Sequence, residues 1–190
     1  MNKAYWEKRY QNNDTGWDTG KITTPLKEYI DQIKNKDLKI LIPGAGNGYE
    51  FDYLIGNGFS NVTVIDIAKQ PIEALKKKNP KHTANFIQGN FFELNNTFDL
   101  IIEQTFFCAL HPEMRSKYAT KMYSLLEENG KIAGLLFEFP LTEVGPPFGG
   151  SKEEYFNLFS QKFNIKTLQR AYNSIKPRKD RELFFIFEKK

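Results

Sequence analysis

A glycine-rich segment and an aspartate that follows it at a set distance are the residues of this chain best suited to ligand binding. Gly44, Gly46 and Gly48 form a G-x-G-x-G pattern directly after an apolar run at 38–43. Glycine lets the backbone approach a ligand at distances that a Cβ atom forbids. Asp66 follows Gly44 by 22 positions, at the end of the next apolar run. This spacing suits a carboxylate that binds both hydroxyls of a ribose, so the pair predicts a nucleoside-containing cofactor.

Each of these features also has a simpler explanation. Glycines between a strand and a helix often form only a tight turn, and an aspartate at a strand end often starts one. A nicotinamide or flavin site would need a third small residue at position 49, where this chain has Tyr49. A nicotinamide-dependent oxidoreductase is therefore a less favoured alternative. A noncatalytic module that binds the cofactor is another.

Aromatic side chains are the second group with chemical potential, because the chain has 17 phenylalanines, 9 tyrosines and 2 tryptophans. Such rings can wall small apolar pockets and stabilise a cationic ligand group by cation–π contact. The candidates for this role are Trp6, Tyr10, Trp17, Phe106 and Phe107. For Phe106 and Phe107, burial as core residues at the end of a strand is an equally good explanation.

The sequence offers no evident catalytic acid, base or enzyme nucleophile. His82 lies in a polar segment and His111 directly precedes Pro112, so we expect both histidines to be noncatalytic. Cys108 lies among Phe and Ala residues, which indicates packing rather than a reactive thiol. We also expect no metal, because no residues have the clustered spacing of metal ligands.

Composition favours one cytoplasmic domain that acts on small molecules. The 190 residues are 40% hydrophobic, enough for one core, and we expect a single domain at 1–190. One cysteine fits a reducing compartment, and the N-terminus lacks the apolar stretch of a signal peptide or membrane span. The 27 basic residues are scattered among 23 acidic ones, so we interpret the basic runs at 76–78 and 176–181 as solvated surface. We expect a monomer that binds a small molecule, with no nucleic-acid or membrane partner.

Hydrophobic patterning predicts an α/β fold. Strand-length apolar runs at 39–43, 61–67, 84–88, 98–104, 131–138, 165–172 and 183–189 alternate with helical patterns. Helices are expected at 49–55, around Pro71 in a first turn, at 112–126, and at 152–161 behind a Ser151–Glu154 capping box. The last two strands are too close in sequence for a helical crossover, which predicts an antiparallel hairpin at the sheet edge.

Several longer motifs resemble those of class I S-adenosylmethionine-dependent methyltransferases, and more narrowly the thiopurine S-methyltransferase superfamily with its halide and thiol methyltransferase branch. They are GWDTG at 16–20 with TPL at 24–26, IPGAG at 42–46, FDL at 98–100 leading to FFCAL at 106–110, PEMR at 112–115, FEFP at 137–140 and GPP at 145–147. The resemblance covers nearly the whole chain. It implies a Rossmann-like three-layer sandwich with a mostly parallel seven-stranded sheet, an antiparallel C-terminal hairpin and an N-terminal lid at 1–26.

The resemblance also implies residue roles and a reaction. The cofactor would be S-adenosylmethionine, and the methyl acceptor a small soft nucleophile: a thiol, a thiopurine-like thiol, thiocyanate or a halide. Transfer would be a direct in-line displacement. The cofactor-binding residues would be Trp6, Tyr10, Trp17, Gly44, Gly46, Asp66, Asn90, Phe91 and Glu103. The acceptor pocket would be formed by Trp17, Phe106, Phe107 and Phe137.

Five positions depart from the pattern that the resemblance leads us to expect. Asn90 replaces an aspartate common in class I enzymes, although its amide oxygen can still accept a hydrogen bond. Glu103-Gln104 replaces the Asp-Tyr of the plant-type enzymes, Phe137 replaces a tyrosine, and Tyr10 replaces a tryptophan. These departures bear on the choice of acceptor more than on cofactor binding.

Overall fold

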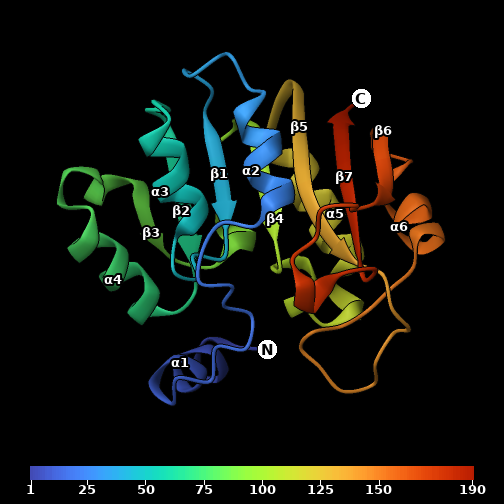
Figure 1. Cartoon of the computed structure of the whole chain (residues 1–190), viewed down its shortest axis with the longest axis horizontal. Helices are drawn as coiled ribbons and strands as arrows, with labels where there is room; N and C mark the ends of the chain where they lie inside the picture. Colours follow the sequence, from blue (N-terminus) through green and yellow to red (C-terminus); the bar gives the residue numbers. More distant parts are fainter.

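The apolar runs form one seven-stranded sheet in a computed structural model that describes residues 1–83 and 85–190. The strand order is β3-β2-β1-β4-β5-β7-β6 (Figure 1). The strands are β1 (Ile40–Pro43), β2 (Val62–Asp66), β3 (Phe86–Gln88), β4 (Phe98–Gln104), β5 (Leu126–Phe137), β6 (Phe163–Arg170) and β7 (Glu182–Lys189). The first five pair in parallel, whereas β7 is antiparallel to both β5 and β6. The predicted C-terminal hairpin at the sheet edge is confirmed.

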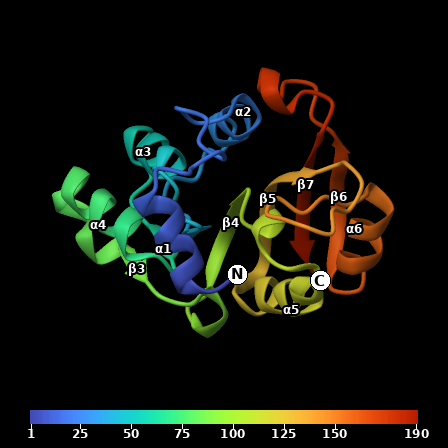
Figure 2. The same ribbon diagram turned by 90° about the horizontal axis from the view of Figure 1, so that it is seen from below.

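Helices cover both faces of the sheet, which confirms the predicted three layers (Figure 2). They are α1 (Lys3–Gln11), α2 (Thr24–Asp31), α3 (Tyr49–Gly56), α4 (Lys69–Lys78), α5 (Arg115–Ser124) and α6 (Lys152–Phe159). Successive strand side chains point to opposite faces. In β1, Ile40 and Ile42 therefore pack with α2, α3 and α4, whereas Leu41 packs on the side of α5 and α6. Burial on both faces explains why these strands read as continuous apolar runs.

Several element boundaries differ from the sequence-based expectation. The helix predicted at 112–126 is divided into a 3-10 turn at Pro112–Met114 and α5, and it stops at Ser124. The amide of Phe98 donates to the carbonyl of Leu125 at 2.8 Å, which draws this end of the helix into the sheet, and β5 consequently begins at Leu126. β6 is displaced by two residues because Phe163 is buried against Phe187.

Two further boundaries differ near the edge strand β3 and at the N-terminus. β3 starts at Phe86, after the 3-10 segment Pro80–Asn85, and Ala84, the first residue of the predicted strand, lies outside the described residues. Helices α1 and α2 were not expected from the pattern. Asn2 caps α1 by accepting a hydrogen bond from the amide of Tyr5 at 3.0 Å, and Pro25 occupies the first turn of α2.

The order of the strands reverses between β1 and β4, and ligands bind at such a switch point beyond the carboxyl ends of the strands. Helix α1 lies across these ends, beneath β1, β2 and β4 (Figures 1 and 2). The link between β6 and β7, which includes the 3-10 turn Lys176–Arg178, approaches the same edge. Within the described ranges, the helices are too short or too polar to cross a membrane.

Candidate active site

A cavity of about 420 Å³ opens at the carboxyl ends of β1, β2 and β4. This volume lies in the range of pockets that enclose a small ligand. Six segments contribute to its wall: α1 with the loop after it, the glycine loop with the start of α3, the end of β2, the end of β4 with the turn after it, the segment after β5 and the β6–β7 link. The site is therefore assembled from both ends of the chain and from the centre of the sheet.

The glycine loop bends sharply between β1 and α3. Gly44, Gly46 and Gly48 all have positive φ, at 80°, 50° and 72°. A Cβ at Gly44 would lie 3.1 Å from Cδ2 of Phe106, and one at Gly48 would collide with Leu75 of α4. A Cβ at Gly46 would meet no protein atom within 4 Å, and Gly46 lines the cavity. Glycine at position 46 thus keeps a strip of backbone open to a ligand.

Asp66, the last residue of β2, lies beside this loop and lines the cavity. Its Oδ2 accepts a hydrogen bond from the amide of Ala45 at 2.8 Å, and its Oδ1 accepts one from the amide of Ala68 at 2.8 Å. Burial raises the pKa of this carboxyl, while the backbone amides oppose that shift. Each oxygen keeps a further lone pair, so the oriented carboxylate can accept ligand hydroxyls.

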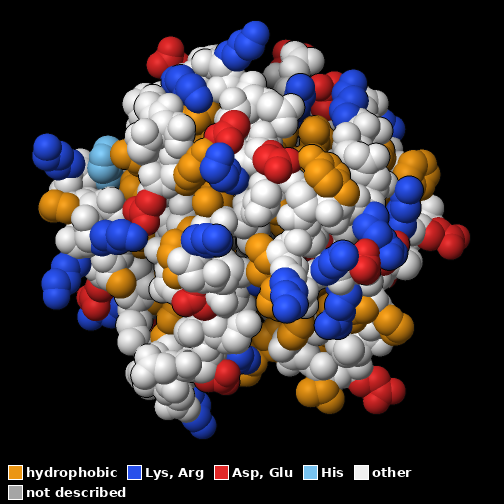
Figure 3. Space-filling view, in the orientation of Figure 1, with side chains coloured by type: hydrophobic (Ala, Val, Ile, Leu, Met, Phe, Trp, Pro, Cys, Tyr) orange, Lys and Arg blue, Asp and Glu red, His pale blue; other side chains and the backbone are white. Residues whose placement is uncertain are grey.

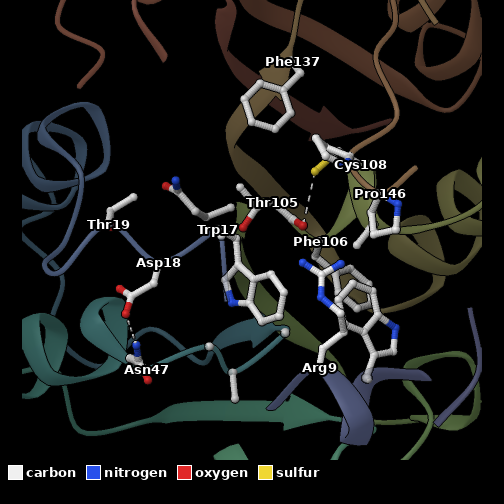
Figure 4. A pocket seen from close by; sticks show the side chains of 18 of the residues that line it. Arg9, Trp17, Asp18, Thr19, Asn47, Thr105, Phe106, Cys108, Phe137 and Pro146 are labelled. Carbon is white, nitrogen blue, oxygen red and sulfur yellow. Dashed lines mark hydrogen bonds between the residues drawn. The ribbon is translucent and has the colours of Figure 1, made fainter. Parts of the chain in front are cut away.

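Aromatic residues from the N-terminal segment cover the cavity. The ring of Trp17 packs edge-on against Trp6 and Tyr10, with centroid distances of 5.6 Å and 5.5 Å. The Arg9 guanidinium lies 5.1 Å from the centroid of the Trp17 ring, which projects into the cavity (Figure 4). Burial, aided by the charge of Asp66, raises the pKa of Tyr10. Three predicted aromatic residues are thus gathered over the glycine loop.

The loop that carries Trp17 is also tied to the glycine loop. The Asp18 carboxylate accepts hydrogen bonds from Nδ2 of Asn47 at 2.7 Å and from the Tyr49 hydroxyl at 2.9 Å (Figure 4 shows the first). Tyr49, which counted against a dinucleotide site in the sequence, therefore connects α3 to the N-terminal segment.

The opposite part of the cavity is largely apolar. Its wall is formed by Phe106, Cys108, Ala109, Leu110, Phe137, Phe139, Pro146 and Pro147. Cys108 is only 7% exposed, and burial raises the pKa of its thiol, so the sulfur stays protonated near neutral pH. Phe106 and Phe137, which were predicted for an acceptor pocket, thus line this part of the cavity, and the residues named for this wall include no acid or base.

Four of the predicted site residues lie outside the cavity wall. Phe91 and Phe107 are core residues that pack against Tyr118. Asn90 accepts a hydrogen bond from the amide of Phe92 at 3.0 Å and caps a 3-10 turn. The fourth, Glu103, is fully buried beneath the turn that follows β4.

The interpretation of the 176–181 run as solvated surface is wrong for Arg178. Arg178 is 8% exposed, and its guanidinium donates to the carbonyl of Trp17 at 2.8 Å and to the buried Glu182 carboxylate at 3.4 Å. Pairing with a carboxylate and a carbonyl compensates for burying this charge. Lys176, Lys179 and Arg181 are exposed, and basic side chains gather over this part of the surface (Figure 3).

Gln104 and Glu50 are two of the cavity-wall residues that were not predicted as site residues. Gln104 accepts a hydrogen bond from the Thr23 hydroxyl at 2.9 Å through Oε1, while its buried Nε2 has no partner. Glu50 lies in the first turn of α3, and burial raises the pKa of its carboxyl despite the nearby Arg178. Strand alternation places Gln104 on the opposite face from Glu103, a signal that was available but was not used.

The family model for thiopurine S-methyltransferase matches residues 1–189. The chain belongs to this family. A probable thiol methyltransferase 2 of Arabidopsis thaliana is 33% identical over 157 residues, covering 79% of this chain and 69% of the relative. Thiocyanate methyltransferase 1 of Brassica oleracea is 29% identical, covering 93% and 81% of the two chains. A thiopurine S-methyltransferase of Aliivibrio salmonicida is 26% identical, covering 90% and 88%.

Solved structures agree with this family fold. A Burkholderia thailandensis 1,6-didemethyltoxoflavin-N1-methyltransferase, with 1,6-didemethyltoxoflavin and S-adenosylhomocysteine bound, superposes with a TM-score of 0.79 at 17% identity. The match covers 98% of this chain and 86% of that one. As a member of the thiopurine S-methyltransferase family, this protein is an S-adenosylmethionine-dependent methyltransferase with a class I fold. The sequence-based identification of the family and of its cofactor is confirmed.

Proposed function

We propose that this thiopurine S-methyltransferase family enzyme methylates a small soft nucleophile, such as a thiolate, thiocyanate or a halide. The observation that carries the proposal is the cavity itself, which joins an oriented carboxylate and an open glycine loop to an apolar wall without a base. Relatives named for thiol and thiocyanate methylation support this acceptor class.

The residues of the cavity fit S-adenosylmethionine at three points. Asp66 has oriented lone pairs for the ribose hydroxyls, and Gly46 leaves backbone exposed for the methionine part. The unpartnered Nε2 of Gln104 is a buried donor that a bound ligand would satisfy. Glu50 offers a carboxylate for the cofactor ammonium.

The remaining predicted residues take less direct roles in this proposal. Trp6, Tyr10 and Trp17 cover the cofactor, and we propose that residues 1–26 act as its lid. Gly44 shapes the turn against Phe106. Asn90 follows Gly89, whose amide donates to the Asp66 carbonyl at 2.9 Å, so this segment would lie next to an adenine held beyond Asp66.

Bound S-adenosylmethionine supplies a methyl group on a positively charged sulfonium, and the charge disappears as the methyl group is transferred. The task of the protein is therefore to orient a nucleophile and exclude water. Phe106, Phe137 and the two prolines of the GPP motif form a dry wall for this purpose. An acceptor that is already an anion needs no base, and the protonated Cys108 offers none.

The experiment is a calorimetric titration with S-adenosylhomocysteine, followed by methylation assays with iodide, thiocyanate, hydrosulfide and an aromatic thiol. Saturable binding with turnover of at least one of these acceptors supports the proposal. Binding without turnover across the panel favours the noncatalytic cofactor-binding module instead. A folded protein that does not bind S-adenosylhomocysteine contradicts the assignment of the cavity.

We further propose that the enzyme acts in the cytoplasm as a monomer and without nucleic acid. Support comes from the cavity, which is completed by residues of one chain. Sedimentation at micromolar concentration is expected to give the 22.1 kDa monomer, and a stable dimer would contradict this part.

A further inference from the structure

Glu103 is a buried carboxylate that the reaction described above does not use. It is the penultimate residue of β4, and its exposed fraction is 0%. No basic side chain pairs with it among the salt bridges of the described residues. Burying a carboxylate without a paired cation costs folding free energy, and the hydrogen bonds of the Glu103 side chain offset part of this cost.

These hydrogen bonds all concern the turn that follows β4. Oε1 accepts from the amide of Phe106 at 2.8 Å and from the amide of Phe107 at 3.0 Å. Oε2 accepts from the hydroxyl of Tyr118, in α5, at 2.6 Å. One side chain therefore satisfies two backbone donors of the turn and links them to a helix behind the sheet.

The turn needs such support because its backbone is unusual. Thr105 has a φ of 58°, in the left-handed region that a β-branched residue rarely adopts. This conformation ends β4 and directs Thr105, Phe106 and residues 108–110 along the cavity wall, while Phe107 enters the core. The Phe106 ring then packs beside Gly44, and the carbonyl of Cys108 accepts from the amide of Phe148 at 2.8 Å.

The strand that bears Glu103 is itself held tightly. Gly134 of β5 lies opposite Glu103 in the sheet, and a Cβ at Gly134 would come within 2.1 Å of the Glu103 carbonyl oxygen. The base of the Glu103 side chain therefore cannot shift easily, and its carboxylate is a fixed reference point for the turn.

We propose that Glu103 is a positioning residue, whose carboxylate holds residues 105–110 in the geometry that methyl transfer requires without contacting either substrate. The inference rests on the proposed function, because these residues form the acceptor side of the cavity. Phe106 would contact the acceptor from the cavity wall, and Glu103 would position Phe106 through the hydrogen bond to its amide.

The test compares Glu103→Gln, Glu103→Ala and Tyr118→Phe after the wild type has been shown to turn over an acceptor. The glutamine keeps an oxygen that accepts both amides, so kcat/KM for the acceptor is expected to stay within about threefold of wild type. Glu103→Ala removes the acceptor of both amides, so the turn is no longer held in place. If the cavity wall moves by about 1 Å as a result, kcat/KM for the acceptor is expected to fall by about 10- to 100-fold. Tyr118→Phe leaves the Oε1 bonds intact and is expected to fall between them.

Two controls separate positioning from a general loss of stability. Phe163→Leu removes core volume at the far end of β6, outside the cavity wall, and its kcat/KM is expected to match wild type below its melting temperature. The dissociation constant of S-adenosylhomocysteine is expected to change less than about threefold in Glu103→Ala, because Asp66 and Gly46 lie on other strands or loops.

Either of two results would overturn the positioning role. One is a folded Glu103→Ala protein with wild-type kcat/KM, and the other is a Glu103→Gln protein as impaired as Glu103→Ala. A wild type that binds S-adenosylhomocysteine but methylates no acceptor would instead count against the proposed function, since that measurement precedes the variants.

Discussion

The carboxylate of Asp66 accepts a hydrogen bond from the amide of Ala45 at 2.8 Å. This bond joins the end of β2 to the glycine loop after β1, so that the two features of the sequence most suggestive of a cofactor form one continuous surface. The second oxygen is held by the amide of Ala68, also at 2.8 Å. The carboxylate is thus oriented before any ligand binds.

Replacing Asp66 should weaken cofactor binding. Asp66→Ala is expected to raise the dissociation constant of S-adenosylhomocysteine by about 10- to 100-fold, because hydrogen bonds to a charged group contribute about 1.5–3 kcal/mol. Calorimetry on protein shown to be folded by thermal unfolding gives the comparison. Asp99→Asn is the matched control, since Asp99 accepts from the amide of Lys39 at the other end of the sheet. Equal effects of both variants would contradict a ribose-binding role.

Gln104 should contribute more to the affinity for the cofactor product than to the stability of the free protein. Gln104→Leu removes a buried donor without a partner, but it also removes the acceptor of the buried Thr23 hydroxyl. These two effects on stability oppose each other, so the free protein is expected to unfold at about the same temperature as the wild type. The affinity for S-adenosylhomocysteine is expected to fall about 3- to 30-fold, measured as a smaller thermal shift with ligand. Thr23→Val, which releases Oε1, is expected to act in the same direction but less strongly. An unchanged affinity in Gln104→Leu would place this amide outside the binding site.

Glu103 should make the stability of the enzyme depend on pH. Burial raises the pKa of this carboxyl from 4.5 to about 7. The folded state then holds a proton that the unfolded state has already lost, so stability is lost as the pH rises from about 4.5 to about 7. Relative to Glu103→Gln, which is neutral throughout, the free energy of unfolding of the wild type is expected to fall by up to about 3 kcal/mol over this window. Urea unfolding at pH 5, 6, 7 and 8 measures the difference, and a constant difference would refute the shifted pKa.

Asp18 should control how long the cofactor product stays bound. Asp18→Ala removes the acceptor of Asn47 and Tyr49, and is expected to speed the dissociation of S-adenosylhomocysteine by about three- to tenfold. Stopped-flow tryptophan fluorescence follows this step because Trp17 lies on the same loop. Asp31→Ala removes a partner of Lys27 and Tyr53 outside that loop and serves as the control. Identical dissociation rates in all three proteins would argue against a lid.

The exposed lysines of the β6–β7 link should attract anionic acceptors. The double change Lys176→Gln and Lys179→Gln is expected to lower kcat/KM for thiocyanate by about two- to fivefold at low salt and to flatten its dependence on ionic strength. Lys76→Gln with Lys77→Gln makes the same change of charge at the end of α4 and is expected to have little effect. Assays between 20 and about 300 mM salt distinguish the pairs. Equal losses in both pairs would show that only net charge matters.

The sequence by itself determined the family, the sheet and the positions of Gly44, Gly46 and Asp66 at strand ends. These follow from local chemistry: strand-length apolar runs must be buried, and parallel strands bring their carboxyl ends to one edge. The same logic correctly predicted an antiparallel C-terminal hairpin, because the link before β7 is too short for a crossover.

Tertiary structure decided which side chains of each segment face the cavity. Phe106 lines the cavity, whereas Phe107 enters the core. In the same way, Gln104 lines the cavity, whereas Glu103 lies beneath the turn. The reason is that neighbouring side chains in a strand or tight turn point in different directions. The burial of Arg178 also could not be predicted from the sequence, because one of its partners is the carbonyl of Trp17, 161 positions away, and the other is Glu182. Contacts between segments so distant depend on how the layers pack, and a pattern along one segment carries no record of them.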